Sequence, residues 1–307
     1  MNKITSRILT KIGDMDLLKK IISLPKSEFN SLMLEIFKMQ MEDTSPKDVL
    51  KAYEINRFVK PSEIDSMAYS LFEYHVLRIA KSLDFENILL SPSAPLGSCS
   101  AFGCVNQYNV LSAVRGTETL ADPSNMLAII IADKIKNKTL AQDITHTLTT
   151  TRVVRAQPIP DIKGFYAHFG VLCMVSHGKD VGLYMCETNL ISKHVEYVKK
   201  LLMEQEQSLL EISVEFRKRN GYKDSDGLLK KIAELMELQF PDMNTIFDYS
   251  DSDNNYYKGV NYKIYIIKDG EKIELGDGGF VDWISQMTGS KKERCLITGI
   301  GIDRFIV

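Results

Sequence analysis

The stretch that decides the fold is Gly299-Ile300-Gly301-Ile302-Asp303-Arg304-Phe305, at the end of the chain. Two segments precede it, Tyr256-Tyr257-Lys258-Gly259 and Leu275-Gly276-Asp277-Gly278-Gly279-Phe280-Val281-Asp282. From Val260 to Ile266, large apolar residues alternate with more polar ones, which predicts a half-buried strand. Asp269-Gly270 predicts a hairpin after that strand. The chain is therefore expected to close with antiparallel strands and a glycine-rich strand-to-helix segment.

Two more strands are expected upstream. One covers Arg152 to Gln157 and the other Val171 to Val175, with a loop of ten residues, Pro158 to Ala167, between them. The second run is apolar throughout, as is typical of a strand buried on both faces. A shorter apolar run, Ile88-Leu89-Leu90, ends at Ser91-Pro92, where proline interrupts the hydrogen-bond ladder.

Helices are expected at the N-terminus and in the middle of the chain. Ser45-Pro46 begins a short helix with proline in the first turn. Ser62 and Asp65 resemble a capping box for the helix that follows. The densely charged segment from about Ser192 to Leu238 is expected to be helical, in two or three pieces divided at Asn220-Gly221 and Asp226-Gly227. Its charged stretch from Lys199 to Lys231 is expected to be a solvated helical face. Strands flanked by helical blocks indicate the α+β class with a mostly antiparallel sheet.

The composition excludes several classes of protein. In 307 residues, 38 Lys and Arg against 40 Asp and Glu leave a formal charge of -2, so no global basic field would recruit nucleic acid. No apolar run approaches the roughly 20 residues that span a bilayer, and the N-terminus lacks a secretory signal. Five cysteines, an odd number, predict a reduced, cytoplasmic protein. Cys99 and Cys104 have no second pair at metal-ligand spacing, so no metal site is expected.

Taken in order, the three C-terminal segments resemble the last part of the class II aminoacyl-tRNA synthetase catalytic domain. The nearest resemblance is to histidyl-tRNA synthetase and the regulatory subunit of ATP phosphoribosyltransferase. These proteins carry a Tyr-Tyr-x-Gly strand, a Gly-Gly-Arg-Tyr-Asp segment and the class's motif 3, Gly-x-Gly-x-Asp/Glu-Arg. The resemblance implies that Gly299 and Gly301 leave room for a nucleotide and that Arg304 meets the terminal phosphate of ATP.

The rest of the core is similar to the same family. Asp84 to Pro92, after a helix, resembles motif 1, which builds a dimer interface, so a homodimer is implied. Arg152 to Gln157 and Ala167 to Val171 resemble the two strands of motif 2. By that match Arg155 would hold the α-phosphate and the substrate carboxylate, Phe169 would stack on adenine, and His168 would neighbour the adenine.

The resemblance also implies a substrate pocket for a small amino or carboxylic acid. Attack of a carboxylate on the α-phosphorus mainly needs positioning and neutralisation of negative charge, for which two arginines and Mg2+ suffice. Arg155 and Arg304 are therefore the candidate catalytic residues. The candidates for substrate binding are Arg115, Glu118, Asp122, Gln157, Tyr257, Gly278 and Asp282.

The sequence departs from the family at four places. Gln157 replaces the acid of motif 2, Asp122 to Asn125 replaces an Arg-Pro-Glu-type turn, and Phe280 replaces the arginine of the Gly-Gly-Arg segment. The sequence ends three residues after Arg304, so no anticodon-binding domain is expected. Together with the balanced charge, this argues against charging of a tRNA.

Several candidates also have purely structural interpretations. Arg155 would equally suit a pair with a structural carboxylate, and a strand phenylalanine such as Phe169 is more often part of a core. Arg115 and Glu118 would pair with each other across a turn. Close strand packing would explain the glycines of the second segment, Gly278 among them, as well as phosphate binding does.

Two functional hypotheses follow. The first is an enzyme that binds ATP and Mg2+ and activates a small acid as its adenylate, which the retention of Arg155 and Arg304 favours. The second is a non-catalytic paralogue that binds a small ligand and regulates a partner enzyme, which the lost acid and arginine favour. In domain terms we expect an N-terminal helical extension over residues 1–65 and a synthetase-like core over 66–307, with a helical insertion at about 190–245.

Overall fold

The centre of the protein is an eight-stranded sheet with the strand order β1-β4-β5-β10-β9-β8-β6-β7. The computed structural model describes residues 1–103, 105–158, 166–204, 211–250, 256–268 and 271–306, without the side chains of Lys268 and Arg304. The strands of this sheet are β1 (Glu86–Asn87), β4 (Thr145–Val154), β5 (His168–Lys179), β6 (Glu211–Lys218), β7 (Asn244–Asp248), β8 (Lys258–Lys268), β9 (Glu271–Val281) and β10 (Glu293–Gly301). The central pairings are antiparallel, and β1 with β4 and β6 with β7 are parallel.

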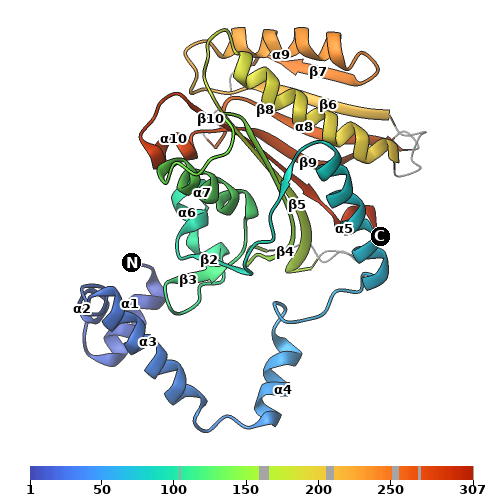
Figure 1. Ribbon diagram of the computed structural model, residues 1–307. Helices are drawn as coiled ribbons and strands as arrows, with labels where there is room; N and C mark the ends of the chain where they lie inside the picture. Colours follow the sequence, from blue (N-terminus) through green and yellow to red (C-terminus); the bar gives the residue numbers. More distant parts are fainter. Residues whose placement is uncertain (104, 159–165, 205–210, 251–255, 269–270, 307) are drawn as a thin grey trace.

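Helices cover both faces of the sheet (Figure 1). We call one the α8 face, because α8 (Met185–Glu204) covers it with α5 (Ser66–Ser82) and α9 (Ser225–Gln239). The other is the α7 face, which α7 (Pro123–Lys136) and α10 (Trp283–Thr288) cover, with α6 (Ser98–Gly103) packed on α7. A short ribbon of β2 (Ser93–Pro95) and β3 (Thr117–Thr119) borders this face. The predicted α+β class with a mostly antiparallel sheet is confirmed.

Strand β5 explains why two cores form. Its side chains alternate, so Leu172 and Met174 join the core on the α8 face, and Cys173 and Val175 join the core on the α7 face. The prediction of a strand buried on both faces is confirmed. The hairpin that joins β8 to β9 is confirmed by their pairing, although Asp269 and Gly270 themselves lie outside the described residues.

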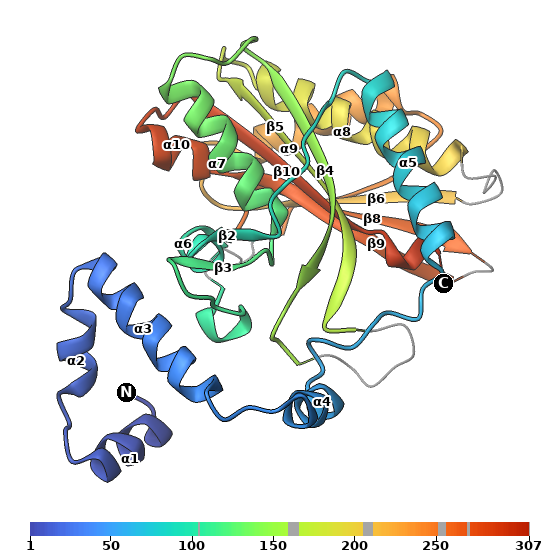
Figure 2. The same ribbon diagram turned by 60° about the horizontal axis from the view of Figure 1, so that its bottom comes forward.

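Four N-terminal helices project from the sheet and its covering helices (Figures 1 and 2). They are α1 (Lys3–Ile12), α2 (Leu17–Ile22), α3 (Lys26–Met41) and α4 (Pro46–Ile55). Leu9 is the one buried residue between Met1 and Asp65, all of which the structure describes. The predicted start of α4 is confirmed, because Ser45 and Asp48 form a capping box. The predicted cap at Ser62 is wrong, since Asp65 accepts the hydrogen bond that begins α5.

The middle of the chain differs in part from the prediction of two or three helical pieces between Ser192 and Leu238. Helices α8 and α9 are present, but residues 211–218 form strand β6, which pairs with β7 at the edge of the main sheet. The charged residues of β6, among them Glu215 and Arg217, resemble those of a solvated helix, which is why a helix was predicted here. They instead belong to a strand near the edge of the sheet, where charged side chains reach water. Among the described residues, no helix is both long and apolar enough to span a membrane.

Candidate functional site

A row of four residues crosses the middle of the sheet on its α7 face. The strand register aligns Thr149 of β4, Cys173 of β5, Gly299 of β10 and Asp277 of β9. A Cβ atom built on Gly299 would meet nothing within 4 Å. The sheet is therefore open above Gly299, and we call this row and the space above it the floor.

Arg155 stands beside the floor, just after the end of β4. Its Nε donates a hydrogen bond to the carbonyl of Ala121 at 3.0 Å, and its guanidinium carbon lies 5.1 Å from the ring centroid of Phe169. Among the described residues, no carboxylate forms an ion pair with Arg155, so the structural pair considered from the sequence is not seen. The two terminal nitrogens are held in place without a protein partner in the described part of the chain, as an anion-binding guanidinium requires.

Two carboxylates belong to this region: Asp277 is part of the floor, and Asp122 follows Ala121, whose carbonyl Arg155 binds. Asp277 accepts a hydrogen bond from the Tyr257 hydroxyl at 2.8 Å, and burial raises the pKa of Asp277. Asp122 caps α7 by accepting hydrogen bonds from the amide and hydroxyl of Ser124, at 3.0 and 2.5 Å. The helix that Asp122 caps begins at the edge of the floor, where its partial positive charge favours an anionic group.

Buried aromatic rings close the site on the β8 side. Tyr257 is 7% exposed, and its ring meets that of Tyr256 edge-on with centroids 4.7 Å apart. Tyr256 also packs edge-on against Trp283 at 5.8 Å. Burial raises the pKa of both tyrosines, so they act as neutral hydroxyl groups. Their packing fixes the position of the Tyr257 hydroxyl, and hence of Asp277.

Among the described residues, Glu118 and Arg115 make no contact with each other. Glu118 is fully buried in β3, where one oxygen accepts hydrogen bonds from the amide of Gly97 and from Gln107, both at 2.8 Å, and the other accepts from the amide of Cys99 at 3.2 Å. Arg115 is exposed in a left-handed turn with φ 66°. The predicted pairing between Arg115 and Glu118 is wrong, because backbone amides and Gln107 take up the carboxylate.

The candidate glycines divide between the two faces. Gly301 lies two residues after Gly299 on the same face. Gly278 instead serves packing on the α8 face, because a Cβ there would lie 2.7 Å from the Tyr262 ring and 2.8 Å from the Thr298 hydroxyl. Of the two interpretations given for Gly278, the structure supports close strand packing.

Three further candidates lie away from the floor. His168 points to the α8 face, where Nδ1 lies 3.0 Å from Arg152 and Nε2 lies 2.6 Å from the carbonyl of Lys60. Asp282 follows β9 and contacts Gln286 at 2.8 Å. Gln157 is exposed, and its carbonyl accepts a hydrogen bond from Arg57 at 3.0 Å. Alternation along a strand explains the placement of His168, since Phe169 next to it faces the other way.

Arg304 lies in the short 3-10 helix Asp303–Phe305 that follows β10, and its side chain lies outside the described residues. The neighbouring Asp303 accepts a hydrogen bond from the amide of Gly170 at 2.9 Å and lies 3.4 Å from Arg152. This contact ties the end of motif 3 to the start of β5. The role of Arg304 stays a prediction.

Sequence reasoning missed Asp277, Cys173 and Thr149. Counting back by twos from Val281, which faces α7, would have placed Asp277 on the same face. Burial raises the pKa of the Cys173 thiol, so Cys173 lines the floor as a neutral thiol and is not a nucleophile. In the described part of the chain, no group of three or more His, Cys, Asp or Glu side chains is placed to hold a metal ion.

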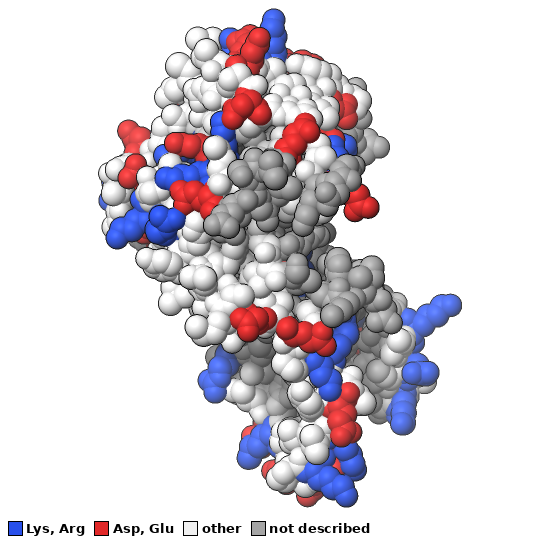
Figure 3. Space-filling model, turned by 90° about the vertical axis from the view of Figure 1, so that its right-hand side faces the viewer, with Lys and Arg blue, Asp and Glu red and all other residues white. Residues whose placement is uncertain are grey.

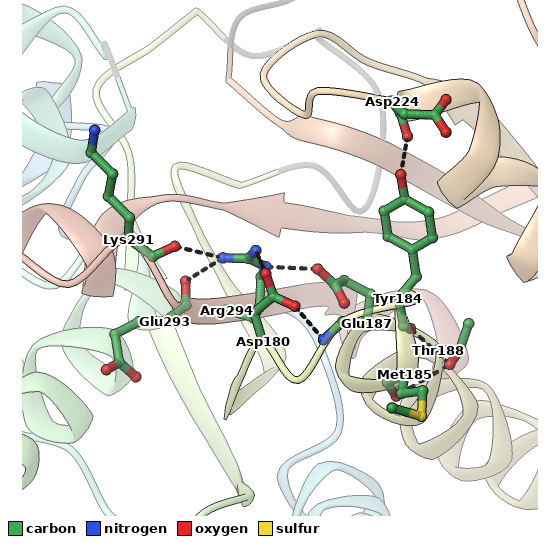
Figure 4. A network of polar contacts seen from close by, with 10 residues as sticks. Asp180, Tyr184, Met185, Glu187, Thr188, Asp224, Lys291, Glu293 and Arg294 are labelled. Carbon is green, nitrogen blue, oxygen red and sulfur yellow. Dashed lines mark hydrogen bonds and ion pairs between the residues drawn. The ribbon is translucent and has the colours of Figure 1, made fainter.

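A charged network on the α8 face is structural. Arg294 of β10 donates to Glu187 at 2.6 Å, to Asp180 at 2.5 Å and to the carbonyl of Lys291 at 2.9 Å (Figure 4). Its guanidinium also lies 5.4 Å from the ring centroid of Tyr222. These contacts fix the turn between β5 and α8.

Comparison with solved structures identifies the fold. An ATP phosphoribosyltransferase regulatory subunit/histidyl-tRNA synthetase from Bacillus halodurans C superposes with a TM-score of 0.61 at 12% identity, over 81% of this chain and 82% of that chain. This chain has the class II aminoacyl-tRNA synthetase-like fold. Apo histidyl-tRNA synthetase from S. aureus matches with a TM-score of 0.61 at 8% identity, over 82% and 68% of the two chains.

A putative threonyl-tRNA synthetase from Aeropyrum pernix is also similar, with a TM-score of 0.61 at 12% identity. This match covers 77% of the present chain and 58% of the synthetase chain. No protein-family model and no curated protein matches the sequence. The predicted class II synthetase-like fold is confirmed, and at these identities the likeness concerns the fold alone.

Proposed function

We propose that this chain binds ATP and activates a small amino or carboxylic acid as its adenylate, without charging a tRNA. The observation that carries the proposal is the pairing of an open floor at Gly299 with an anchored Arg155 whose terminal nitrogens have no partner among the described residues. A class II synthetase-like sheet with these two features suits a triphosphate.

The chemistry assigns one task to each group. The substrate carboxylate attacks the α-phosphorus and pyrophosphate leaves, while Arg155 neutralises the charge that builds on the α-phosphate. Asp277 and the Tyr257 hydroxyl orient the acid, and Asp277 accepts from its amino group. The carboxylate of Asp122 fits Mg2+, which is usually held by one or two carboxylates plus substrate phosphates and would screen the phosphate charge when bound.

The tRNA part of the proposal rests on charge. Acidic and basic side chains are mixed over the face of the molecule in Figure 3, and the formal net charge is -2. A surface that tracks a tRNA backbone would need a continuous basic stripe. The adenylate is therefore expected to pass to an acceptor other than tRNA.

Pyrophosphate exchange into ATP across a panel of amino and carboxylic acids tests the proposal. Arg155→Ala should lower exchange by about 10- to 150-fold, because it removes charge-assisted hydrogen bonds worth roughly 1.5–3 kcal/mol. Arg78→Ala, at an arginine of α5 on the α8 face that pairs with Glu204, is the matched control and should leave exchange unchanged. Equal exchange in the wild type and Arg155→Ala would contradict the role of Arg155.

The second candidate is a non-catalytic paralogue that regulates a partner enzyme. One observation supports it: Phe280, at the place of the family arginine, is 1% exposed and belongs to the core on the α8 face. Position 280 therefore supplies no positive charge to the floor, where the family arginine would. Ligand binding without any exchange, together with ligand-dependent co-purification of an enzyme, would favour the regulator over the ligase.

We also propose a homodimer through the motif 1 region. Leu89, just after β1, is 95% exposed, and Met67, Leu71 and Tyr74 of α5 are each at least 66% exposed. Apolar residues this exposed are typical of an interface. Light scattering should give the mass of a dimer, and Leu71→Lys should give a monomer if the proposal holds.

A further inference from the structure

A chain of five polar side chains runs through the core on the α8 face. The neighbours along it are 2.7, 2.8, 2.6 and 2.5 Å apart. In order they are His146 of β4, Ser176 of β5, His194 of α8, Thr298 of β10 and Tyr262 of β8. The last four are at most 1% exposed, whereas His146 lines a cavity of about 740 Å³ at the surface.

The buried end of the chain sets the direction of its hydrogen bonds. Tyr262 and Thr298 have no acceptors among the described residues other than each other and His194. One of the two hydroxyl groups can donate to the other, and the second must then donate to His194 Nδ1. His194 Nδ1 is therefore an acceptor, and His194 Nε2 donates to Ser176. A proton on Nδ1 would leave a buried hydroxyl hydrogen without an acceptor, at a cost of about 1–3 kcal/mol.

The same direction fixes the tautomer of His146. Ser176 then donates to His146 Nδ1, which leaves the proton of the neutral ring on Nε2. Burial, with a contribution from Lys193, lowers the pKa of His146 to about 4, so the ring is neutral at physiological pH. Nε2 makes no hydrogen bond within the described residues, and His146 therefore offers an N–H donor to the cavity.

Charges of both signs surround this donor. The cavity lies between α8, the loop after α7 and the turn before β1, and its lining includes Asp84, Glu86, Lys134, Lys193 and Glu196. Lys134 and Glu86 occupy each other at 2.7 and 2.8 Å. Lys193 reaches Glu196 only at 3.5 Å, and Asp84 has no ion pair in the described part of the chain.

We propose that this cavity is a second ligand site, which binds a small zwitterion of the α-amino acid class. The ligand carboxylate accepts from His146 Nε2 and from Lys193, and the ligand ammonium group binds Asp84. His146 offers a donor of fixed direction, Lys193 is a weakly engaged cation, and Asp84 is a carboxylate without a cation among the described residues. These three groups match the two ends of such a molecule. None of the floor residues lines this cavity, so it is distinct from the floor at Gly299.

Calorimetric titration of the full chain with each of the twenty common L-amino acids tests the proposal. At least one should bind, and Asp84→Asn and Lys193→Gln should each weaken its binding at least about tenfold. The same acid without its amino group should bind at least about tenfold more weakly. Lys199→Gln, on α8 but paired with Asp242, is the matched control and should leave binding unchanged.

Other outcomes would overturn the proposal. The first is that no amino acid binds at millimolar concentration. The second is that binding is unchanged in both Asp84→Asn and Lys193→Gln. The third is that Arg155→Ala abolishes binding while Asp84→Asn retains it, which would place the ligand at the floor. The imidazole nitrogens of His146 give an independent readout by NMR. The proposal requires the Nε2–H tautomer and a shift of the Nε2 resonance on binding, and an Nδ1–H tautomer would contradict it.

Discussion

Gly299→Val is expected to separate folding from nucleotide binding. A Cβ at Gly299 would meet nothing within 4 Å, and its backbone does not adopt a positive φ. Valine should therefore leave the free energy of unfolding unchanged or raise it by about 0.5–1 kcal/mol, because glycine weakens strands. A ligand lying over the floor would overlap the new side chain at a cost of about 1–3 kcal/mol, so its affinity should fall by about 5- to 150-fold.

The matched control is Gly278→Ala on the neighbouring strand. Its Cβ would lie 2.6 Å from the carbonyl oxygen of Ile297 and 2.7 Å from the Tyr262 ring, so it should destabilise the fold by about 1–3 kcal/mol. Urea unfolding and calorimetric titration with ATP and Mg2+ measure both quantities. Unchanged ATP affinity in Gly299→Val would refute the placement of the nucleotide, and unfolding like that of Gly278→Ala would refute the open floor.

Three further substitutions have defined outcomes. Arg294→Gln leaves Glu187, which is 1% exposed, without its cation and should lower the free energy of unfolding in urea by about 3–5 kcal/mol. Arg78→Gln, in a surface pair, should lower it by only about 0–1 kcal/mol. Equal losses would contradict the buried network. Glu118→Gln places an amide N–H₂ among donors and should cost about 1–3 kcal/mol, whereas the exposed Glu271→Gln should cost less than about 0.5. The lowered pKa of His146, about 4 against 6.5, means that the unfolded chain binds more protons between these pH values, so stability present above pH 6.5 is lost as pH falls towards 4. Urea unfolding at several pH values should show that the stability of His146→Gln depends less on pH than that of the wild type. The difference in the free energy of unfolding lost between pH 6.5 and 4 should be at most about 3 kcal/mol, before solvent screening of the partly exposed ring. Identical pH dependences would refute this cause.

Much of the fold was predictable because its signals are local. The alternation from Val260 to Ile266 and the apolar run from Val171 to Val175 identify β8 and β5 directly. The charged segment that contains β6 was not predictable in this way. A strand near the edge of a sheet contains charged residues as a solvated helix does, and only the pairing of β6 with β7 and β8 distinguishes the two.

The site was predictable only in part, because spacing along the chain does not show which face a side chain takes. The structure brings Arg155, Phe169 and Gly299 to the α7 face as the motifs imply, but it places His168 on the other face. Asp277 was missed because the family segment directed attention to Asp282, five positions further along. The neighbourhood of Glu118 depends on the fold of the loop from Gly97 to Gln107, which no local pattern specifies.

A crystal structure with ATP, Mg2+ and saturating substrate acid tests the central claim most directly. The account predicts the triphosphate above Gly299, with an α-phosphate oxygen within about 3 Å of a terminal nitrogen of Arg155. A nucleotide bound elsewhere, or a face that stays empty of nucleotide at saturation, would contradict it.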